Sequence, residues 1–346
     1  MFLGFRILLI CGKLFFPVLV AIILYQADLK AEIPVGEKGF NDTVLDEPIL
    51  LPGWFKLSFL DIKEDLREAK ADGKKGVILY YGQQRCPYCK ALIENSFNKK
   101  DIELYIKENF DIIAIDVRGS RIVTTLKDEK ITEKKYSILQ NASFTPTLEF
   151  YDTQGVRVHR LVGYFPPYTI RAALEFVSDE HYKNETFKTY LDRGNIPHRD
   201  SKGEIYYRHF SMKSPYYLAR NKIRAQRPLM VIFEQKNCHA CDVLHASVFQ
   251  NEVILSRINN IDVVQLDMSG DEKVIDPAGR KITSRHWAEE LGIFYAPTMV
   301  FYDESGVELL RLGSVVHFNR LNKVLRYIDT HAYRNYKNFI DWLVAN

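Results

Sequence analysis

Four of the five cysteines stand in two close pairs, and these are the residues best suited to chemistry. Cys86 and Cys89 form one Cys-x-x-Cys pair, and Cys238 and Cys241 form the other. A cysteine at the start of a helix lies beside unpaired backbone N–H groups and the positive end of the helix dipole, which lower its pKa. A second cysteine one turn further on can then attack a mixed disulfide. The pairs therefore predict thiol–disulfide exchange, with Cys86 and Cys238 attacking and Cys89 and Cys241 resolving.

Two other uses of the cysteines compete with this interpretation. Two Cys-x-x-Cys pairs can form a four-thiolate zinc site, but such pairs usually lie about 15–20 residues apart. Here about 148 residues separate them, so we expect no metal and no organic cofactor. The second pair, with its unusual His-Ala dipeptide, could instead be an inert disulfide. A tandem binding module without catalytic activity is the non-enzymatic alternative.

An internal repeat explains why there are two pairs. Residues 130–152 align without a gap with residues 281–303, an offset of about 151 residues, and both segments contain Lys-Ile-Thr and Phe-Tyr-Asp. The two first cysteines are one residue out of this register. The length of the repeat indicates duplication of a whole domain, because solenoid repeats have periods of only about 20–50 residues.

The same order of elements is expected in both copies. Apolar runs at 77–81 and 229–233 have the length of buried strands, and each is followed by a Cys-x-x-Cys pair that opens a helix. A helix, a strand and a further helix then lead to a Pro-Thr that precedes two hairpin-linked strands and a final helix. This order predicts an α/β fold with a mixed central sheet flanked by helices in each copy.

These motifs resemble the thioredoxin superfamily. Cys86-Pro87-Tyr88-Cys89 is followed by Thr145-Pro146, and Cys238-His239-Ala240-Cys241 is followed by Ala296-Pro297. Both copies are most similar to exported SoxW-type thioredoxins and to the C-terminal domain of the DsbD reductase. The resemblance implies two thioredoxin folds in tandem, in which a cis proline lies against each cysteine pair and shapes the substrate-binding backbone. It assigns that role to Pro146 and Pro297, with Thr145 and Ala296 beside them.

Other residues near the cysteines are expected to modulate the reactivity of their thiols. Pro87 suits the first turn of a helix, Tyr88 lies between the paired cysteines, and a protonated His239 would stabilise a Cys238 thiolate. The sequence departs from cytoplasmic thioredoxin in lacking a carboxylate six residues before the first cysteine, where it has Tyr80 and Ile232. Glu234 is a nearby carboxylate in the second copy only.

The N-terminus predicts export. Residues 14–25 are an uncharged apolar run after Arg6 and Lys13, as in a signal peptide, although an uncleaved membrane tether is the alternative. From residue 178 we expect a linker that becomes a helix at Tyr216. The expected organisation is a signal peptide or N-terminal anchor at 1–31, an N-terminal linker at 32–54, a first thioredoxin-like domain at 55–178, a linker at 179–213, a second thioredoxin-like domain at 214–330 and a C-terminal helix at 331–346.

The whole-chain properties narrow the function. The chain has 346 residues and a formal net charge of +3, which gives no sign of a nucleic-acid partner. We expect a periplasmic or otherwise exported thiol–disulfide oxidoreductase that exchanges disulfides with protein substrates. A reductase is favoured, and the resemblance then implies a membrane electron donor of the DsbD type. A disulfide oxidase or isomerase is the alternative, and transfer of electrons from one pair to the other is a further hypothesis.

Overall fold

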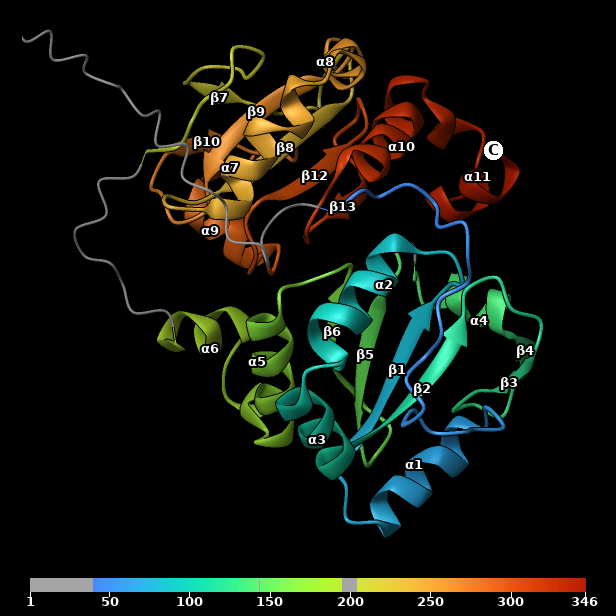
Figure 1. The fold of residues 1–346 in the computed structure, drawn as a ribbon. Helices are drawn as coiled ribbons and strands as arrows, with labels where there is room; N and C mark the ends of the chain where they lie inside the picture. Colours follow the sequence, from blue (N-terminus) through green and yellow to red (C-terminus); the bar gives the residue numbers. More distant parts are fainter. Residues whose placement is uncertain (1–39, 143, 195–203) are drawn as a thin grey trace, which may run out of the picture. The chain divides into compact units, whose positions relative to one another are not determined.

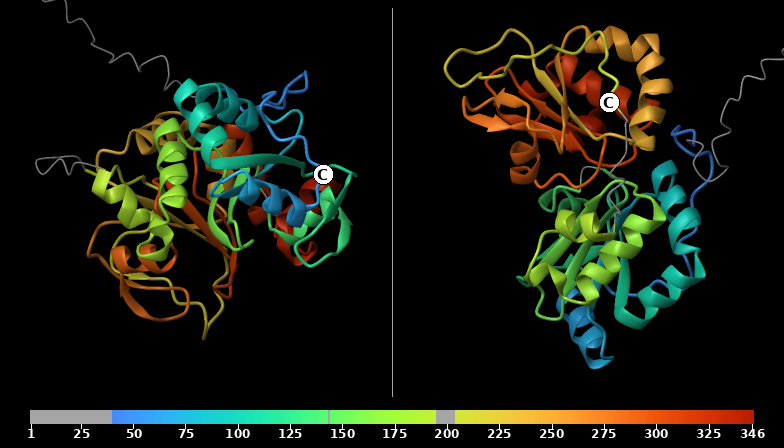
Figure 2. Two further views of the ribbon diagram at one scale, coloured as in Figure 1. Left: turned by 90° about the horizontal axis from the view of Figure 1, so that it is seen from below. Right: turned by 90° about the vertical axis from the view of Figure 1, so that its left-hand side faces the viewer.

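Each of the two repeats forms a four-stranded sheet with helices on both faces (Figures 1 and 2). The computed structural model describes residues 40–142, 144–194 and 204–346, and Gly39–Asn346 form one compact unit. The predicted signal peptide or anchor at 1–31 lies outside the described residues. Among the helices that are described, none has the length and apolar character needed to span a membrane.

In the first repeat, the central strand β1 (Gly76–Gly82) is parallel to β2 (Phe110–Asp116) and antiparallel to β5 (Thr147–Asp152). Strand β6 (Arg157–Val162) completes the order β2-β1-β5-β6. The remaining elements are α1 (Ile62–Ala71), α2 (Pro87–Leu92), a π-helical turn (Ile93–Phe97), α3 (Lys100–Asn109), the hairpin of β3 (Ile122–Thr124) and β4 (Lys130–Thr132), α4 (Glu133–Leu139), α5 (Pro167–Ser178), a 3-10 turn (His181–Lys183) and α6 (Phe187–Gly194).

The second repeat has the same sheet, in the order β13-β12-β8-β9. Its central strand β8 (Leu229–Glu234) is parallel to β9 (Asp262–Asp267) and antiparallel to β12 (Thr298–Tyr302), which pairs with β13 (Glu308–Leu312). The helices are α7 (His239–Ala246), α8 (Glu252–Ile258), α9 (Ser284–Glu290), α10 (Phe318–Asp329) and α11 (Phe339–Ala345), with 3-10 turns at Val248–Gln250 and Ala332–Arg334.

Strand β1 is buried along its whole length because helices cover both faces of the sheet. Ile78 and Tyr80 point into a core formed with α2, α3 and α5. Val77 and Leu79 point to the other face, into a core formed with α1 and α4. A continuous apolar run, rather than an alternating one, is what a strand buried on both faces requires. The predicted strand at 77–81 is thus confirmed.

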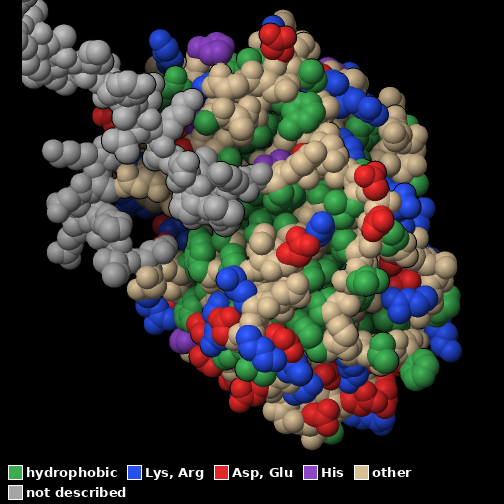
Figure 3. Space-filling model, viewed as in Figure 1, with side chains coloured by type: hydrophobic (Ala, Val, Ile, Leu, Met, Phe, Trp, Pro, Cys, Tyr) green, Lys and Arg blue, Asp and Glu red, His purple; other side chains and the backbone are tan. Residues whose placement is uncertain are grey.

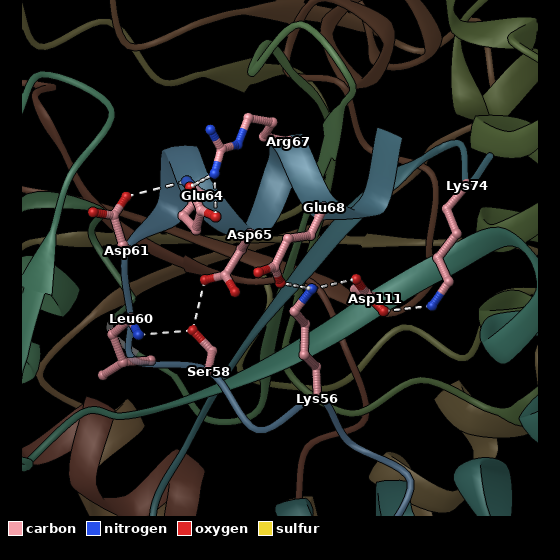
Figure 4. Close-up of polar contacts among 10 residues, drawn as sticks. All are labelled: Lys56, Ser58, Leu60, Asp61, Glu64, Asp65, Arg67, Glu68, Lys74 and Asp111. Carbon is pink, nitrogen blue, oxygen red and sulfur yellow. Dashed lines mark hydrogen bonds and ion pairs between the residues drawn. The ribbon is translucent and has the colours of Figure 1, made fainter. Parts of the chain in front are cut away.

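A polar network attaches α1 to β2 (Figure 4). The ammonium of Lys56 lies 2.7 Å from Asp111 and 2.8 Å from Glu68, and Ser58 donates a 2.6 Å hydrogen bond to Asp65. Burial is the main cause that raises the pKa of Asp65 to about 6. Acidic and basic side chains also intermix on the lower part of the surface in Figure 3, so charges near α1 are compensated locally.

The helix predicted to begin at Tyr216 is wrong. The described residues 204–238 contain no helix, and Tyr216–Tyr217 form the short strand β7. This strand is parallel to β10 (Lys273–Ile275), which pairs with β11 (Lys281–Thr283). The reason is visible in the burial, because Tyr216, Leu218 and Arg220 are buried while the residues between them are exposed. That alternation suits a strand and not a helix.

In both repeats a carboxylate accepts hydrogen bonds from the backbone after the second sheet strand, but it comes from different positions, and only Glu133 of the first repeat is fully buried. In the first repeat Glu133 accepts hydrogen bonds from the backbone N–H groups of Asp116, at 2.9 Å, and Arg121, at 3.2 Å. The aligned residue of the second repeat is Ser284. There Glu272 instead accepts from the Asp267 N–H, at 3.3 Å.

Candidate active site

The first cysteine pair lies at the start of α2. Cys86 is the N-cap residue, with φ −93° and ψ 112°, and Pro87 occupies the first turn. The Sγ atom of Cys86 accepts a 3.0 Å hydrogen bond from the backbone N–H of Cys89. Because the N–H groups of the first turn have no partner within the helix, this position suits a sulfur anion. Cys86 and Cys89 are free thiols with exposed fractions of 1% and 0%.

The loop before β5 packs against this pair. The Thr145-Pro146 peptide bond is cis, as the resemblance implies. The Sγ of Cys86 lies 3.2 Å from Thr145 Oγ1 and 3.6 Å from the Thr145 carbonyl oxygen. The Gly163 N–H donates a 2.8 Å hydrogen bond to the carbonyl of Pro146 and attaches the loop to the end of β6. The structure therefore brings Cys86, Cys89, Thr145 and Pro146 together.

The two thiols of this pair differ in acidity. Burial raises the pKa of Cys86, but hydrogen bonds from Cys89 and Thr145 and the positive charge of Arg320 outweigh it and lower the pKa to about 7. Cys89 has the opposite balance, because burial and the neighbouring Cys86 raise its pKa well above the usual value. Near neutral pH, a larger fraction of Cys86 than of Cys89 is therefore in the thiolate form.

The second pair repeats this geometry at the start of α7. Cys238 is the N-cap residue, and its Sγ accepts a 3.1 Å hydrogen bond from the Cys241 N–H. A disulfide joins the two cysteines. The Ala296-Pro297 peptide bond is cis, and the Ala296 carbonyl oxygen lies 3.5 Å from the Sγ of Cys238. His239 is the exposed first residue of α7, and its effect on Cys238 stays a prediction.

Tyr88, which lies between the paired cysteines in the sequence, is buried and hydrogen-bonded on both sides of its hydroxyl. Its side chain is 4% exposed, and its hydroxyl donates a 2.8 Å hydrogen bond to Asp42 and accepts one of 2.9 Å from the His317 N–H. Burial is the main cause of the raised pKa of Tyr88. Tyr88 therefore connects the first cysteine pair to the N-terminal segment and to the second repeat.

Sequence reasoning missed Arg320, from the first turn of α10. Its guanidinium lies 3.3 Å from the ring centroid of Tyr88, and its Nη2 donates a 2.6 Å hydrogen bond to the Thr145 carbonyl. Arg320 also lines a cleft of about 150 Å³ that contains Cys86. The aligned residue of the first repeat is Thr169, so no repeated motif could have indicated the arginine.

The polar residue behind each cysteine pair also differs between the repeats. Tyr80 of β1 is 1% exposed, and its hydroxyl has no well-aligned hydrogen-bond partner among the described residues. Burial is the largest cause that raises the pKa of Tyr80, and the neighbouring Cys89 is the next. In β8 the corresponding polar residue is Glu234, which is paired with His245 at 2.8 Å and accepts from Gln265 at 3.2 Å.

Within the described parts of the chain, no three His, Cys, Asp or Glu residues converge on a position that could hold a metal ion. The two sites share one arrangement of residues. Each consists of a Cys-x-x-Cys pair at the start of a helix and a cis proline from a neighbouring loop. On this α/β sheet, that combination defines the thioredoxin class of fold.

A comparison with family models agrees with this class. The model described as a thioredoxin-like domain matches residues 62–178 and again residues 219–329. The two matches together cover more than half of the chain. The chain therefore belongs to the thioredoxin-like domain family, which it contains twice. No curated protein matches it.

The chain is also similar to solved structures, at low identity and low TM-score. A thioredoxin-fold protein from Helicobacter pylori is 24% identical, with a TM-score of 0.32, and the match covers 35% of this chain and 84% of that one. A thioredoxin from Thermus thermophilus is 22% identical, with a TM-score of 0.27, over 34% and 83%. A DsbH oxidoreductase is 13% identical, with a TM-score of 0.26, over 38% and 91%.

Proposed function

We propose that the chain is a thiol–disulfide oxidoreductase that reduces disulfides of protein substrates. In the first step the Cys86 thiolate attacks one sulfur of a substrate disulfide. A bond forms between Cys86 and that sulfur, the substrate S–S bond breaks, and the second substrate sulfur leaves as a thiolate. The positively charged surroundings of Cys86 and the N–H group of Cys89 support this role by stabilising the attacking anion.

The second step regenerates free substrate. Cys89 loses its proton and attacks the Sγ of Cys86, so that a Cys86–Cys89 disulfide forms and the bond between Cys86 and the substrate breaks. The substrate leaves as its second thiolate and has gained two electrons, while the cysteine pair has lost two. The 3.0 Å contact between Cys86 Sγ and the Cys89 N–H places the resolving residue directly beside the bond that must break.

The observation that carries the proposal is the place of Cys86 at the N-cap of α2, where its Sγ accepts the Cys89 N–H and lies against Thr145 beside the cis proline. The two thiols differ in acidity in keeping with this geometry. A pKa of about 7 gives Cys86 a large thiolate fraction near neutral pH. The raised pKa of Cys89 keeps the resolving thiol protonated until the mixed disulfide has formed. A structural cysteine pair or an inert binding module has no need for such a difference.

The second pair is proposed to work in the same way, since its Cys238 has the same N-cap position and the same cis-proline contact. The apolar N-terminal run further supports an exported protein, cleaved or tethered to a membrane. In an oxidising compartment a reductase must itself be reduced, so we include a membrane dithiol donor of the DsbD type in the proposal.

The test measures reduction of a protein disulfide by the fully reduced chain, together with the redox potential of each pair. We expect Cys86→Ser to abolish the part of the reduction that depends on the first pair, and Cys89→Ser to accumulate a mixed disulfide at Cys86. Peptide mass spectrometry after alkylation reads each pair separately. A potential near about −270 mV supports a reductase, whereas one near about −120 mV indicates a disulfide-donating oxidase.

The matched control is Cys238→Ser, which removes the attacking thiol of the other repeat and leaves the first pair intact. If neither pair titrates reversibly and Cys89→Ser traps no substrate, the chain is a binding module and the proposal is wrong. Equal trapping by the double variant Cys86→Ser/Cys89→Ser also contradicts it, because trapping then does not involve the attacking thiol.

A further inference from the structure

The first cysteine site contains a cation that the first repeat does not supply. Arg320 belongs to α10 of the second repeat, yet its Nη2 and the Sγ of Cys86 both reach the carbonyl oxygen of Thr145, at 2.6 Å and 3.6 Å. Its guanidinium also stacks on the ring of Tyr88, the residue that precedes Cys89 in the sequence. The charge of a planar arginine is thus fixed beside the attacking sulfur by two independent contacts.

The charge of Arg320 is not neutralised by a carboxylate. No ion pair joins its guanidinium to an acidic residue of the described segments, and its Nη1 is buried without a hydrogen-bond partner there. Arg320 is partly buried, so a charge on it without a direct counterion is less well stabilised than it would be in water. A thiolate at Cys86 would supply the missing negative charge, so the arginine and the thiolate stabilise each other.

Asp42 explains why this arginine is held in place. The N-cap residue of α10, His317, makes no side-chain capping bond. The carboxylate of Asp42 instead accepts hydrogen bonds from the backbone N–H groups of Asn319, at 2.9 Å, and Arg320, at 2.8 Å. Asp42 therefore caps α10 from the N-terminal segment and is engaged with amides and with the hydroxyl of Tyr88.

We propose that Arg320 is a positioning residue of the Cys86 site: it holds the Thr145 carbonyl and places a positive charge beside the sulfur, so that the second repeat completes the thiol site of the first. The inference deepens the proposed function, but its test reads the thiol itself and needs no substrate. The positive charge of Arg320 is among the causes that lower the pKa of Cys86, after burial, which raises it, and the hydrogen bonds from Cys89 and Thr145.

Several other groups surround the sulfur and must be considered in any titration. They come from the N-terminal segment, β1, α2, the loop after β2 and the start of α10. The titratable or charged residues are Asp42, Tyr80, Arg85, Tyr88, Cys89, Arg118, His317 and Lys323. Lys323 lines the same cleft one turn further along α10 and is the matched control.

The experiment measures the rate of alkylation of Cys86 by iodoacetamide from pH 5 to 10 in the full, reduced chain, with peptide mass spectrometry to identify the modified cysteine. The midpoint of the profile reports the stability of the thiolate, and its plateau reports access to the sulfur. We expect Arg320→Gln to raise the midpoint by about one pH unit, which is about a tenfold smaller thiolate fraction at pH 6. Lys323→Gln, which removes a cation from the same cleft, should move the midpoint by clearly less than Arg320→Gln does.

Arg320→Lys separates charge from shape. It keeps a cation but loses the planar fork, and we expect its midpoint to stay within about half a unit of the parent protein. The proposal is overturned if the midpoint of Arg320→Gln does not move. It is also overturned if Arg320→Gln raises only the plateau of the alkylation rate, because Arg320 then limits access of the reagent to the sulfur and does not stabilise the thiolate. Loss of the disulfide-reducing activity with an unchanged midpoint in Arg320→Gln contradicts this inference and leaves the proposed function standing.

Discussion

Two aligned positions of the central strands differ between the repeats. Tyr80 of β1 corresponds to Ile232 of β8, and Gly82 corresponds to Glu234. A Cβ atom at Gly82 would lie 2.6 Å from the hydroxyl oxygen of Tyr80, so the tyrosine fits only because the residue two positions on has no side chain. In the second repeat an aliphatic residue replaces the tyrosine, and a carboxylate replaces the glycine. Each repeat thus has one buried polar side chain on its central strand near the cysteine pair, but the side chain comes from a different position of the strand.

This exchange gives Tyr80 a testable role in the second step of the reaction. Its hydroxyl is among the influences that lower the pKa of Cys89, against the larger effect of burial, which raises it. We expect Tyr80→Phe to slow release of thionitrobenzoate from a mixed disulfide at Cys86 by roughly fivefold, about 1 kcal/mol, because the Cys89 thiolate then loses a polar neighbour in a buried site. Stopped-flow absorbance measures the release.

The control for Tyr80→Phe is Tyr81→Phe, which removes a hydroxyl from the same strand on its other face. Tyr81 donates to Glu149 at 2.9 Å and does not contact the cysteines in the described structure. Equal release rates in the two variants would show that the Tyr80 hydroxyl has no part in the resolving step. A changed rate of alkylation at Cys86 in Tyr80→Phe would show that the Tyr80 hydroxyl acts on the attack by Cys86, the first step of the reaction.

At the scale of the elements, the first residue of β1 depends on close contact with β5. Gly76 has φ +159°, and a Cβ there would lie 1.9 Å from the carbonyl oxygen of Tyr151. We expect Gly76→Ala to lower the free energy of unfolding by at least about 2 kcal/mol, because the two central strands must separate. Urea unfolding followed by circular dichroism measures the change.

Gly53→Ala is the matched control, since nothing lies within 4 Å of a Cβ at that position. Its effect should stay within about 0.5 kcal/mol. Similar midpoints for the two variants would mean that β1 and β5 can move apart without cost, contrary to the expectation.

The sequence predicted the sheets well because their signals are local. The apolar runs at 77–81 and 229–233 both form buried strands. The cysteine pairs were predicted from a short motif and the cis prolines from the resemblance to thioredoxins, and the structure places them together. The strand β7 was missed because two residues carry too little periodicity, and its burial depends on pairing with β10. The π-helical turn at Ile93–Phe97 has no sequence signal of its own.

Other parts of the site could not be predicted, because their partners lie far apart in the sequence. Asp42 and Arg320 meet through backbone amides and an aromatic ring, and neither residue belongs to a repeated motif. The predicted linker also contains a helix, α6, whose Phe187 packs against Phe176 of α5 with ring centroids 5.2 Å apart. Such contacts arise only from tertiary packing.

At the scale of the whole molecule, acid should weaken the fold through His159 of β6. Its ring lies among Phe150, Phe176 and Phe187, and its Nε2 is buried without a hydrogen-bond partner in the described structure. Burial lowers its pKa to about 3. The unfolded chain takes up the proton near pH 6.5 and the folded chain does not, so stability present above pH 6.5 is lost progressively as the pH falls toward 3.

The measurement is the free energy of unfolding by urea between pH 4 and 7. We expect His159→Leu to remove roughly 2 kcal/mol of the pH dependence in this range, a value reduced from that of a fully buried group because the ring is partly exposed. His286→Leu, at an exposed position, is the matched control. Asp65, with its pKa raised to about 6 by burial, acts in the opposite direction and is the same in all three proteins. Parallel curves for His159→Leu and the parent would contradict the assignment.

The displaced carboxylate of the loop after the second sheet strand restricts how the two copies can exchange sequence during evolution. A recombinant that joined the first copy up to Thr132 to the second copy from Ser284 would inherit neither Glu133 nor Glu272. The N–H groups of Asp116 and Arg121 would then lose the acceptor that they have now. The reciprocal product would carry both acids in one loop. We therefore expect an exchange of sequence at this point to destabilise its product, which would favour independent divergence of the two copies.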